Sequence, residues 1–506
     1  MHNYDVIIIG SGLGGLVCGA ILSRYGYRVT IYEKNRQIGG CLQTYSRDKV
    51  IFDSGVHYLG GLAEGENLCT IFKYLGIYDD LKLKRMDMDG FDHIQFEGDP
   101  EVYRIAQGEE NFVNTLLKQF PGEEPALRAY CAKIREVCSK FPLYNLRIGD
   151  YEEKQRVLHL NTADYLRSIT SNEKLQQVLA GNNLLYAGVA EKTPFYVHAL
   201  VLNSYMNSSW KCVDGGSQIG KLLSRKILAN GGTIVRNMAV TGIVGVGDKV
   251  DHLVLQDGTK VKADYYISNL HPAQTLAITQ SDVIRGAYRN RMEGLANSVG
   301  GFVLNVALKP GSFPYLNYNY YYHAGNNSWA GIDYREEEWP QTYAMYVSAS
   351  SRTTGSAEAL AIMTYMRYEE VAPWQHTFNT DTHACSRGAD YEAFKQRKAE
   401  QLITSVEKRF PGFREAILSY NVATPLSYRD YLGTGDGSMY GIAKDCADPL
   451  RTMVSARTKL SNLYLTGQNL NLHGILGVTL SSIITSAELL GMEFLVGEIN
   501  QSTAVK

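Results

Sequence analysis

The sequence predicts an α/β fold in which two domains are interleaved along the chain. Two observations predict it: a glycine-rich loop follows the apolar run at residues 6–9, and a second glycine-rich segment follows the apolar run at residues 463–465. Each run is typical of a buried parallel strand, and each leads through glycines into a stretch with helical character. The residues between them mix helical and strand-like patterns, which predicts a second domain of mixed sheet and helices.

The N-terminal loop has the spacing of a dinucleotide-binding turn between a strand and a helix. Gly10 permits the tight turn, Gly12 lets a phosphate approach the backbone, and Gly15 lets the helix pack closely on the strand. A pyrophosphate would then meet the N–H groups and the positive end of the helix. Glu33, at the end of the next apolar run, is expected to accept hydrogen bonds from an adenosine ribose that carries no phosphate.

Further glycines indicate which dinucleotide is bound. Gly39 and Gly40 closely follow the second apolar run, and Gly467, Gly474 and Gly477 flank the start of the C-terminal helical stretch. This arrangement resembles the flavoprotein superfamily of amine oxidases and phytoene desaturases. The resemblance implies a Rossmann-like FAD-binding domain of the GR2 type, with FAD as the cofactor and a C-terminal segment that closes over the ribityl chain and flavin ring.

Other segments narrow the resemblance to one branch of that superfamily. They lie at residues 214–220, 263–272, 423–433, 437–441 and 466–468. Together they are similar to carotenoid isomerases, bacterial phytoene-dehydrogenase-like proteins and the all-trans-retinol 13,14-reductases (retinol saturases). The resemblance covers nearly the whole chain. It implies an FAD-dependent oxidoreductase that acts on carbon–carbon double bonds of an isoprenoid or polyene.

The resemblance also implies which residues contact the cofactor. Three residues depart from the family pattern. Cys41 stands where many relatives have an arginine that pairs with the phosphates, so charge must be balanced elsewhere or by the helix dipole. Gln468 and Asn469 stand near the place where wider relatives carry an acid. The predicted cofactor-binding residues are Gly10, Ser11, Gly12, Leu13, Gly14, Gly15, Glu33, Lys34, Gly39, Gly40, Cys41, Val240, Gly467, Gln468, Gly477 and Val478.

The positions of these motifs divide the chain into domains. Residues 1–70, 195–275 and 448–500 would form a discontinuous FAD-binding domain, and residues 71–194 and 276–447 a substrate domain. In the first insert, apolar residues at spacings of three and four predict a helix near residues 127–141. In the second insert we expect strands at 301–308, 343–347 and 360–363, and a helix at about 391–409.

Composition fits a soluble, cytoplasmic two-domain enzyme. The 50 Lys and Arg residues nearly balance the 52 Asp and Glu residues, so nucleic acid is not expected as a partner. Eight cysteines are scattered without metal-like spacing, which predicts no metal site; Cys131 and Cys138, on one helix, are expected to be buried thiols. Glu488 and Glu493 interrupt the apolar segment at 474–496, so no transmembrane span is expected. The sequence sets no oligomeric state.

No catalytic set of polar side chains stands out, so the flavin is expected to carry the chemistry. His57 and His473 are the two candidates for a protein group, because each adjoins a segment that passes the flavin in the family. Either could donate a proton or position substrate. The alternative for each is a histidine bonded to backbone groups in a tight loop. Beyond these two, the catalytic residues stay unknown.

Two other features leave alternatives open. The tyrosine-rich run at 315–322 could line a polyene tunnel or lie at a membrane interface; the alternative is an edge strand whose tyrosines face both ways. The helix near 127–141 carries Arg128, Lys133, Arg135 and Lys140 beside its apolar stripe. It could lie on the inner face of a membrane and make a peripheral contact there. The alternative is an ordinary surface helix that packs inward.

Three classes of function compete. The first is a redox enzyme for a lipophilic small molecule, with retinol-saturase-like reduction as the nearest named activity and desaturation or carotenoid cis–trans isomerisation as alternatives. The second is a flavin amine oxidase. The third is a binder that keeps the fold without the cofactor. The branch-specific segments favour the first, and the intact glycine segments at both ends argue against the third.

Overall fold

Five parallel strands from three distant parts of the chain form one sheet in the computed structural model, which describes residues 4–150, 152–352 and 355–504. Strand β1 is buried on both faces, as parallel strands usually are. The predicted α/β fold is confirmed, whereas the residue-by-residue domain boundaries stay a prediction. The spatial order of the sheet is β10 (Thr233–Val235), β2 (Arg28–Tyr32), β1 (Asp5–Ile9), β14 (Tyr265–Ser268) and β21 (Leu463–Leu465).

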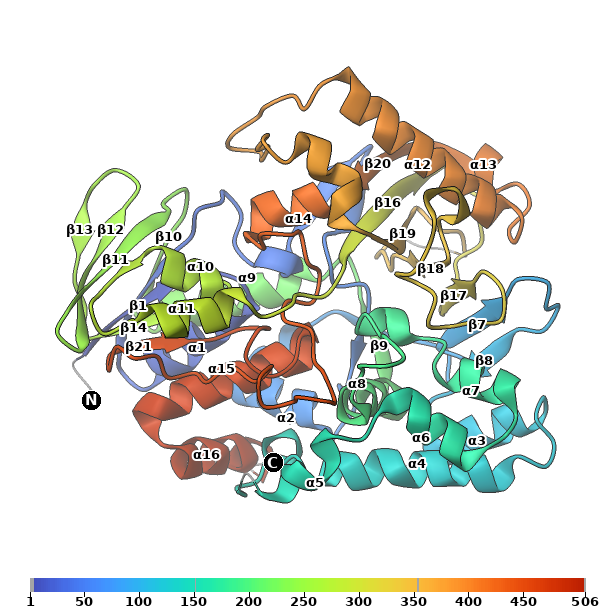
Figure 1. Ribbon diagram of the computed structural model, residues 1–506, viewed down its shortest axis with the longest axis horizontal. Helices are drawn as coiled ribbons and strands as arrows, with labels where there is room; N and C mark the ends of the chain where they lie inside the picture. The colour runs from blue at the N-terminus through green and yellow to red at the C-terminus, as the bar shows by residue number, and fades with distance from the viewer. Residues whose placement is uncertain (1–3, 151, 353–354, 505–506) are drawn as a thin grey trace.

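Helices cover one face of this sheet, and a small β-structure with two helices covers the other (Figure 1). On the first face, α1 (Leu13–Arg24) contacts both α9 (Ser217–Ala229) and α15 (Gly474–Leu490), and α16 (Met492–Ala504) packs on α2 (Asn67–Tyr74). The second face carries β11 (Val240–Val246), β12 (Lys249–Leu255), β13 (Lys260–Val261), β15 (Thr279–Gln280), α10 (Pro272–Ala277) and α11 (Gly286–Glu293).

A seven-stranded mixed sheet organises the other half of the molecule (Figure 1). Its neighbouring strands pair antiparallel, except for the parallel pair β17–β7. The sheet contains the predicted strands of the second insert and two strands of the first. The order is β20 (Ile417–Ala423), β16 (Gly300–Leu308), β19 (Ala359–Met366), β18 (Thr342–Val347), β17 (Asn319–His323), β7 (Asp92–Phe96) and β8 (Tyr103–Ile105).

The second part of the tyrosine-rich run lies in β17, and the prediction of an edge strand was wrong. β17 is interior, because β7 pairs with it on the side away from β18. β7 comes from the first insert, so the local pattern of β17 gives no sign of this partner. The second half of that prediction is confirmed: Tyr321 packs in one core cluster, while Tyr320 and Tyr322 pack in another.

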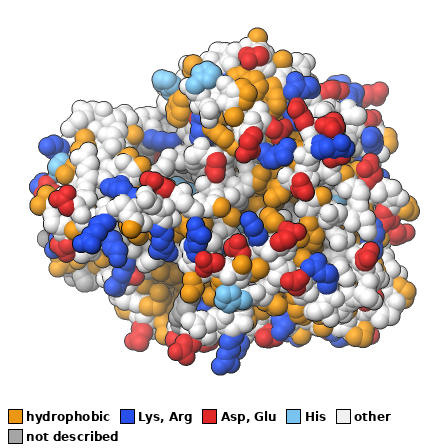
Figure 2. Space-filling model, viewed as in Figure 1, with side chains coloured by type: hydrophobic (Ala, Val, Ile, Leu, Met, Phe, Trp, Pro, Cys, Tyr) orange, Lys and Arg blue, Asp and Glu red, His pale blue; other side chains and the backbone are white. Residues whose placement is uncertain are grey.

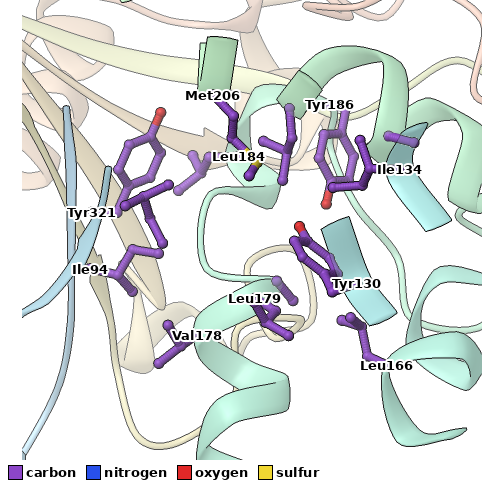
Figure 3. Packing of buried hydrophobic residues seen from close by; sticks show 14 of the residues in the cluster. Ile94, Tyr130, Ile134, Leu166, Val178, Leu179, Leu184, Tyr186, Met206 and Tyr321 are labelled. Atoms are coloured by element: carbon purple, nitrogen blue, oxygen red, sulfur yellow. The ribbon is translucent and has the colours of Figure 1, made fainter. Parts of the chain in front are cut away.

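Six helices between residues 109 and 207 share a core cluster with one face of the mixed sheet. Figure 3 shows Ile94 and Tyr321 of the sheet beside residues of these helices, among them Tyr130. The helices are α3 (Glu109–Leu117), α4 (Glu124–Ser139), α5 (Glu152–Leu158), α6 (Thr162–Ile169), α7 (Glu173–Leu179) and α8 (Phe195–Asn207).

Helix α4 is the predicted helix with a basic face, and it packs inward. Its apolar stripe is buried in the core. Arg128 pairs with Glu110 and Glu124, and Arg135 pairs with Glu109. The apolar face is therefore not available to a bilayer, and acidic partners offset the basic side chains. The interpretation of α4 as an inward-packing surface helix is confirmed, and a peripheral membrane contact of the protein stays a prediction.

The opposite face of the mixed sheet is covered by α12 (Ala389–Glu407) and α13 (Phe413–Ala416), while α14 (Pro425–Leu432) lies near the centre of the molecule (Figure 1). Smaller elements complete the chain. They are β3 (Thr44–Arg47), β4 (Val50–Asp53), β5 (Leu59–Gly60), β6 (Leu83–Arg85), β9 (Ser209–Cys212), and the 3₁₀ turns η1 (Gly40–Leu42), η2 (Tyr78–Asp80), η3 (Leu143–Asn145), η4 (Asn183–Leu185), η5 (Glu336–Glu338) and η6 (Tyr368–Trp374).

Basic and acidic side chains are interspersed over the face shown in Figure 2. All eight cysteines are free, and Cys131 and Cys138 are buried, as predicted. Within the described ranges, no group of three or more potential ligand side chains is placed to hold a metal ion. None of the helices found there is both long and apolar enough to cross a bilayer.

Candidate active site

Backbone contacts hold the glycine loop after β1 between its neighbouring strand and helix. Gly10 has a φ of +91°, and its N–H donates to the carbonyl oxygen of Tyr32 at 2.8 Å. A Cβ atom at Gly15 would lie 2.1 Å from the carbonyl oxygen of Gly10, so this packing requires glycine. No side chain among the described residues caps α1 at Gly12. The N–H groups of its first turn are therefore available to an anion.

Glu33 follows β2 and is 6% exposed. One carboxylate oxygen accepts hydrogen bonds from the backbone N–H of Ser11 at 2.9 Å and from its hydroxyl at 2.6 Å. The other oxygen accepts from the N–H of Asn35 at 2.8 Å. A carboxylate offers about four acceptor positions, which leaves capacity for a ribose hydroxyl. Glu33 therefore stabilises the glycine loop through its hydrogen bonds to Ser11, a role that the sequence did not indicate.

The second glycine pair lies directly against the first loop. The N–H of Gly39 donates to the carbonyl oxygen of Ser11 at 2.9 Å, and Gly39 and Gly40 have φ angles of +109° and +56°. Burial raises the pKa of the Cys41 thiol to about 11, so this residue supplies no charge near neutral pH. Lys34 is held by a backbone carbonyl of α14, and burial lowers its pKa. The positive end of α1 is thus the main feature that would face a phosphate.

The C-terminal segment meets the glycine loop where β21 ends. Gly467 has a φ of +99°, and a Cβ atom at Gly14 would lie only 3.0 Å from its Cα atom. Gln468 follows in the wall of the same cavity, and Gly477 and Val478 of α15 extend that wall. The two glycine segments, more than four hundred residues apart in sequence, are therefore in direct backbone contact.

Asn269 is a site residue that the sequence analysis did not include. Its side-chain amide lies between the two glycine segments: Cβ atoms placed at Gly12 and Gly467 would each lie 2.6 Å from it. Its backbone N–H donates to the carbonyl oxygen of Ile9 at 2.9 Å. A sequence signal existed, because Asn269 directly follows β14, and ligands bind at the carboxyl ends of parallel strands.

The two candidate histidines both line the cavity, and burial lowers the pKa of each to about 4. The ring of His57 stacks on Tyr346 with centroids 4.5 Å apart and planes 6° from parallel. The Nε2–H of His473 donates to the carbonyl oxygen of Leu185 at 2.8 Å. The expected backbone bond is therefore confirmed for His473. Both rings are neutral near pH 7, so neither acts there as an imidazolium acid.

One cavity of about 580 Å³ joins the glycine segments to a chamber rich in tyrosine. Ligand pockets typically measure roughly 300–1,000 Å³. We call the far part the tyrosine chamber; its aromatic wall is Tyr58, Tyr144, Tyr205, Tyr346, Tyr428 and Tyr440. Its aliphatic and thioether wall is Leu68, Leu185, Leu200, Val201, Met363, Met439, Leu472, Leu476 and Leu480.

The structure brings the predicted cofactor residues together. Those in the cavity wall are Gly10, Gly12, Leu13, Gly14, Glu33, Lys34, Gly39, Gly40, Cys41, Val240, Gly467, Gln468, Gly477 and Val478. The other two, Ser11 and Gly15, are buried. Their contacts with a cofactor stay a prediction. The tyrosines of the chamber come from scattered positions, and the sequence analysis did not single them out.

Comparison with known proteins shows what this chain is similar to. A family model for the NAD(P)-binding Rossmann-like domain matches residues 8–75. The chain is 26% identical to the all-trans-retinol 13,14-reductase of Danio rerio over 97% of its own length and 86% of that protein's. It is 23% identical to prolycopene isomerase 1 of an Oncidium hybrid cultivar, over 96% of this chain and 83% of that one. The chain is homologous to both. The predicted resemblance is confirmed.

This homology agrees with the fold. A solved structure of putrescine oxidase with putrescine bound is 12% identical and has a TM-score of 0.65 over 97% of this chain and 99% of that one. At this identity the likeness establishes only that the two chains share a fold. With its Rossmann-like domain and these relatives, the chain is an oxidoreductase with a dinucleotide site.

Proposed function

We propose that the protein is an FAD-dependent oxidoreductase that acts on a carbon–carbon double bond of an isoprenoid or polyene, most like all-trans-retinol 13,14-reductase or phytoene dehydrogenase. The observation that carries this proposal is the single cavity that joins the dinucleotide site to the tyrosine chamber. The relative from Danio rerio, named for retinol reduction, supports the same assignment. A lipophilic small molecule is the partner that follows from it.

The residues at the glycine end fit FAD. The first turn of α1 faces the pyrophosphate position, and Glu33 retains acceptor capacity for the adenosine ribose. Gln468, Gly477 and Val478 provide a second wall beyond the pyrophosphate, which a flavin would need and a nicotinamide dinucleotide would not. When bound in its reduced form, FAD supplies a hydride to a substrate carbon.

The tyrosine chamber binds an apolar substrate and keeps water from it. Its wall combines side chains of α8, α15 and the mixed sheet, among them Leu200, Leu476 and Met363. Burial of a polyene there is favoured by the hydrophobic effect at roughly 25 cal/mol for each Å² of apolar surface. The tyrosine rings also offer flat faces on which a conjugated chain can stack.

The charge of the wall favours this substrate class over amines. Among the described residues that line the cavity, Glu33 is the only acidic one, and it is engaged at the glycine end. An ammonium group in the tyrosine chamber would therefore find no carboxylate partner. The homologous prolycopene isomerase makes flavin-assisted isomerisation the closer alternative.

The deciding experiment is an anaerobic product analysis. The purified protein is expected to be yellow and to release FAD on acid precipitation. Reduced enzyme is then offered retinol, phytoene, lycopene and an aryl polyene in separate reactions. A product heavier by two hydrogens supports reduction, and an isomer of unchanged mass supports isomerisation. A product lighter by two hydrogens, formed only by oxidised enzyme, indicates desaturation. If no polyene reacts and simple amines release hydrogen peroxide, the proposed substrate class is wrong.

A further inference from the structure

A buried carboxyl group lies behind the wall of the tyrosine chamber. Asp92 on β7 has no exposed surface. One of its oxygens accepts a hydrogen bond from the amide of Asn319 at 2.9 Å. The other accepts from the hydroxyl of Tyr58 at 3.2 Å and from the amide of Asn182 at 3.4 Å. These partners are two amides and a phenol, none of which carries a positive charge.

Burial in this neutral surrounding raises the pKa of Asp92 to about 7. The titratable groups around it are the hydroxyls of Tyr58 and Tyr321, with Tyr205 and Tyr346 further away, and the ammonium group of Lys211. Burial also lowers the pKa of Lys211 to about 7. Its Nζ donates to two backbone carbonyls, at 2.8 and 2.9 Å. Asp92 therefore holds a proton through much of the neutral and acidic range.

Tyr58 connects this carboxyl group to the cavity. It lines the tyrosine chamber, and its ring stacks on Tyr205 with centroids 4.3 Å apart. Its hydroxyl contacts Asp92 and also lies 2.8 Å from the hydroxyl of Tyr321. Figure 3 shows that the hydroxyl of Tyr321 points away from Ile94. A further contact of 3.4 Å links Tyr321 to Tyr346 in the chamber wall.

We propose that Tyr58 donates the proton that completes alkene reduction and that Asp92 resupplies it. This inference rests on the proposed function. When a hydride has joined one alkene carbon, its electron pair leaves the neighbouring carbon electron-rich. The O–H bond of Tyr58 breaks as the new C–H bond forms on that carbon. When Asp92 carries its proton, the hydrogen bond between the two groups reverses and the Asp92 O–H donates to the Tyr58 oxygen. The Tyr58 oxygen takes this proton as it gives up its own, and after product release the Asp92 carboxylate regains a proton through Tyr58 from water in the empty chamber.

The geometry explains why the two groups act together. Burial holds the pKa of Tyr58 far above its usual value, so the phenol alone is a poor acid. A carboxylic acid in hydrogen-bond contact lets the phenol lose one proton while it gains another. The hydroxyl of Tyr321 can donate to the Tyr58 oxygen and share the charge that develops there. His57 and His473 are neutral in this pH range and do not replace the pair.

Kinetics of matched variants test the proposal. Tyr58→Phe and Asp92→Asn remove one proton each from the pathway and keep the side-chain shape, so each is expected to slow single-turnover reduction roughly a hundredfold. Tyr343→Phe removes a hydroxyl from the opposite face of the same sheet, where its ring stacks on Tyr322, and is expected to match the wild type. Flavin absorbance confirms that each variant retains FAD. Wild-type rates from both variants would overturn the proposal.

The pH profile separates proton supply from a structural role of Asp92. The acid form is present below its pKa, so the wild-type rate should fall as pH rises through about 7. The rate of Asp92→Asn should be lower and lack this decline. A decline of the same size in the variant would assign the titration to another group and contradict the role of Asp92.

An infrared measurement tests whether the Asp92 carboxyl group holds a proton, and it requires no turnover. The difference spectrum between flavin-loaded wild type and Asp92→Asn at acidic pH should contain the carbonyl stretch of a protonated carboxylic acid, and this band should vanish at alkaline pH. Absence of the band at acidic pH overturns the role of Asp92. Failure of the proposed function is distinguishable, because then the wild type itself reduces no polyene. The band would still report whether Asp92 holds a proton.

Discussion

The two ends of the cavity are lined by different kinds of residue. At the glycine end, Gly12, Gly14 and Gly467 carry no side chain, and their backbones lie close to the amide of Asn269. At the other end, the wall consists of large side chains from helices and sheet, such as Tyr205 and Leu200. The first end specifies a ligand through backbone geometry and a helix dipole. The second specifies one through volume and apolar surface. Substitutions should therefore have different consequences at the two ends.

The largest effect is expected from Gly15→Ala at the glycine end. The added Cβ atom would lie 2.1 Å from the backbone oxygen of Gly10, which cannot rotate away as a side chain could. We expect loss of FAD retention and destabilisation by about 3 kcal/mol or more. Thermal unfolding and flavin absorbance measure both effects. Gly497→Ala in α16 is the matched control, because a Cβ atom there meets nothing within 4 Å. Equal behaviour of the two variants would contradict the close packing.

Glu33→Ala should have the next largest effect. It removes three hydrogen bonds that fasten Ser11 and Asn35 as well as the predicted ribose contact. Hydrogen bonds to charged groups contribute about 1.5–3 kcal/mol each. FAD affinity should fall at least tenfold, and the thermal midpoint of the FAD-free protein should fall as well. Affinity loss with unchanged stability of the FAD-free protein would confine Glu33 to ligand contact.

At the other end, Val201→Trp should impair substrate binding and leave FAD in place. Val201 lines the tyrosine chamber from α8, so the larger ring would occupy space needed by a long substrate. We expect polyene turnover to fall roughly tenfold, a change of about 1.4 kcal/mol in the activation free energy. Leu228→Trp on α9 is the control, since Leu228 is 53% exposed. Loss of FAD from Val201→Trp would mean that the two ends are not separable.

The smallest effect concerns acid stability of the helices that cover the chamber. His198 on α8 is fully buried between the hydroxyls of Tyr130 and Tyr186, and burial lowers its pKa to about 3. Because the folded-state pKa is depressed, the stabilising contribution is present above the unfolded value of about 6.5 and is lost as pH falls below it. In His198→Leu, the loss of stability between about pH 6.5 and pH 5.5 should shrink by about 1 kcal/mol. Chemical denaturation at each pH measures this slope, and an unchanged slope would contradict it.

The two ends of the cavity also differ in how well the sequence predicted them. The glycine end was predictable because a positive φ or a close backbone approach requires glycine. The sequence therefore shows glycines at a recognisable spacing there. Even there, Asn269 was missed, since an asparagine after a strand has many other uses. Cys41 shows how a departure was recognisable from sequence while its consequence, a neutral buried thiol, depended on its surroundings.

The sequence by itself determined the α/β class, the glycine segments of the dinucleotide site and the resemblance to the retinol 13,14-reductases and carotenoid isomerases. Only the tertiary structure decided the tyrosine chamber and its buried carboxyl group. Asp92 and Asn319 are 227 residues apart, and they meet because β7 pairs in parallel with β17. The same pairing makes β17 an interior strand. Such long-range pairing leaves no local pattern, because whether a tyrosine lines a cavity or fills a core depends on which distant segment covers it.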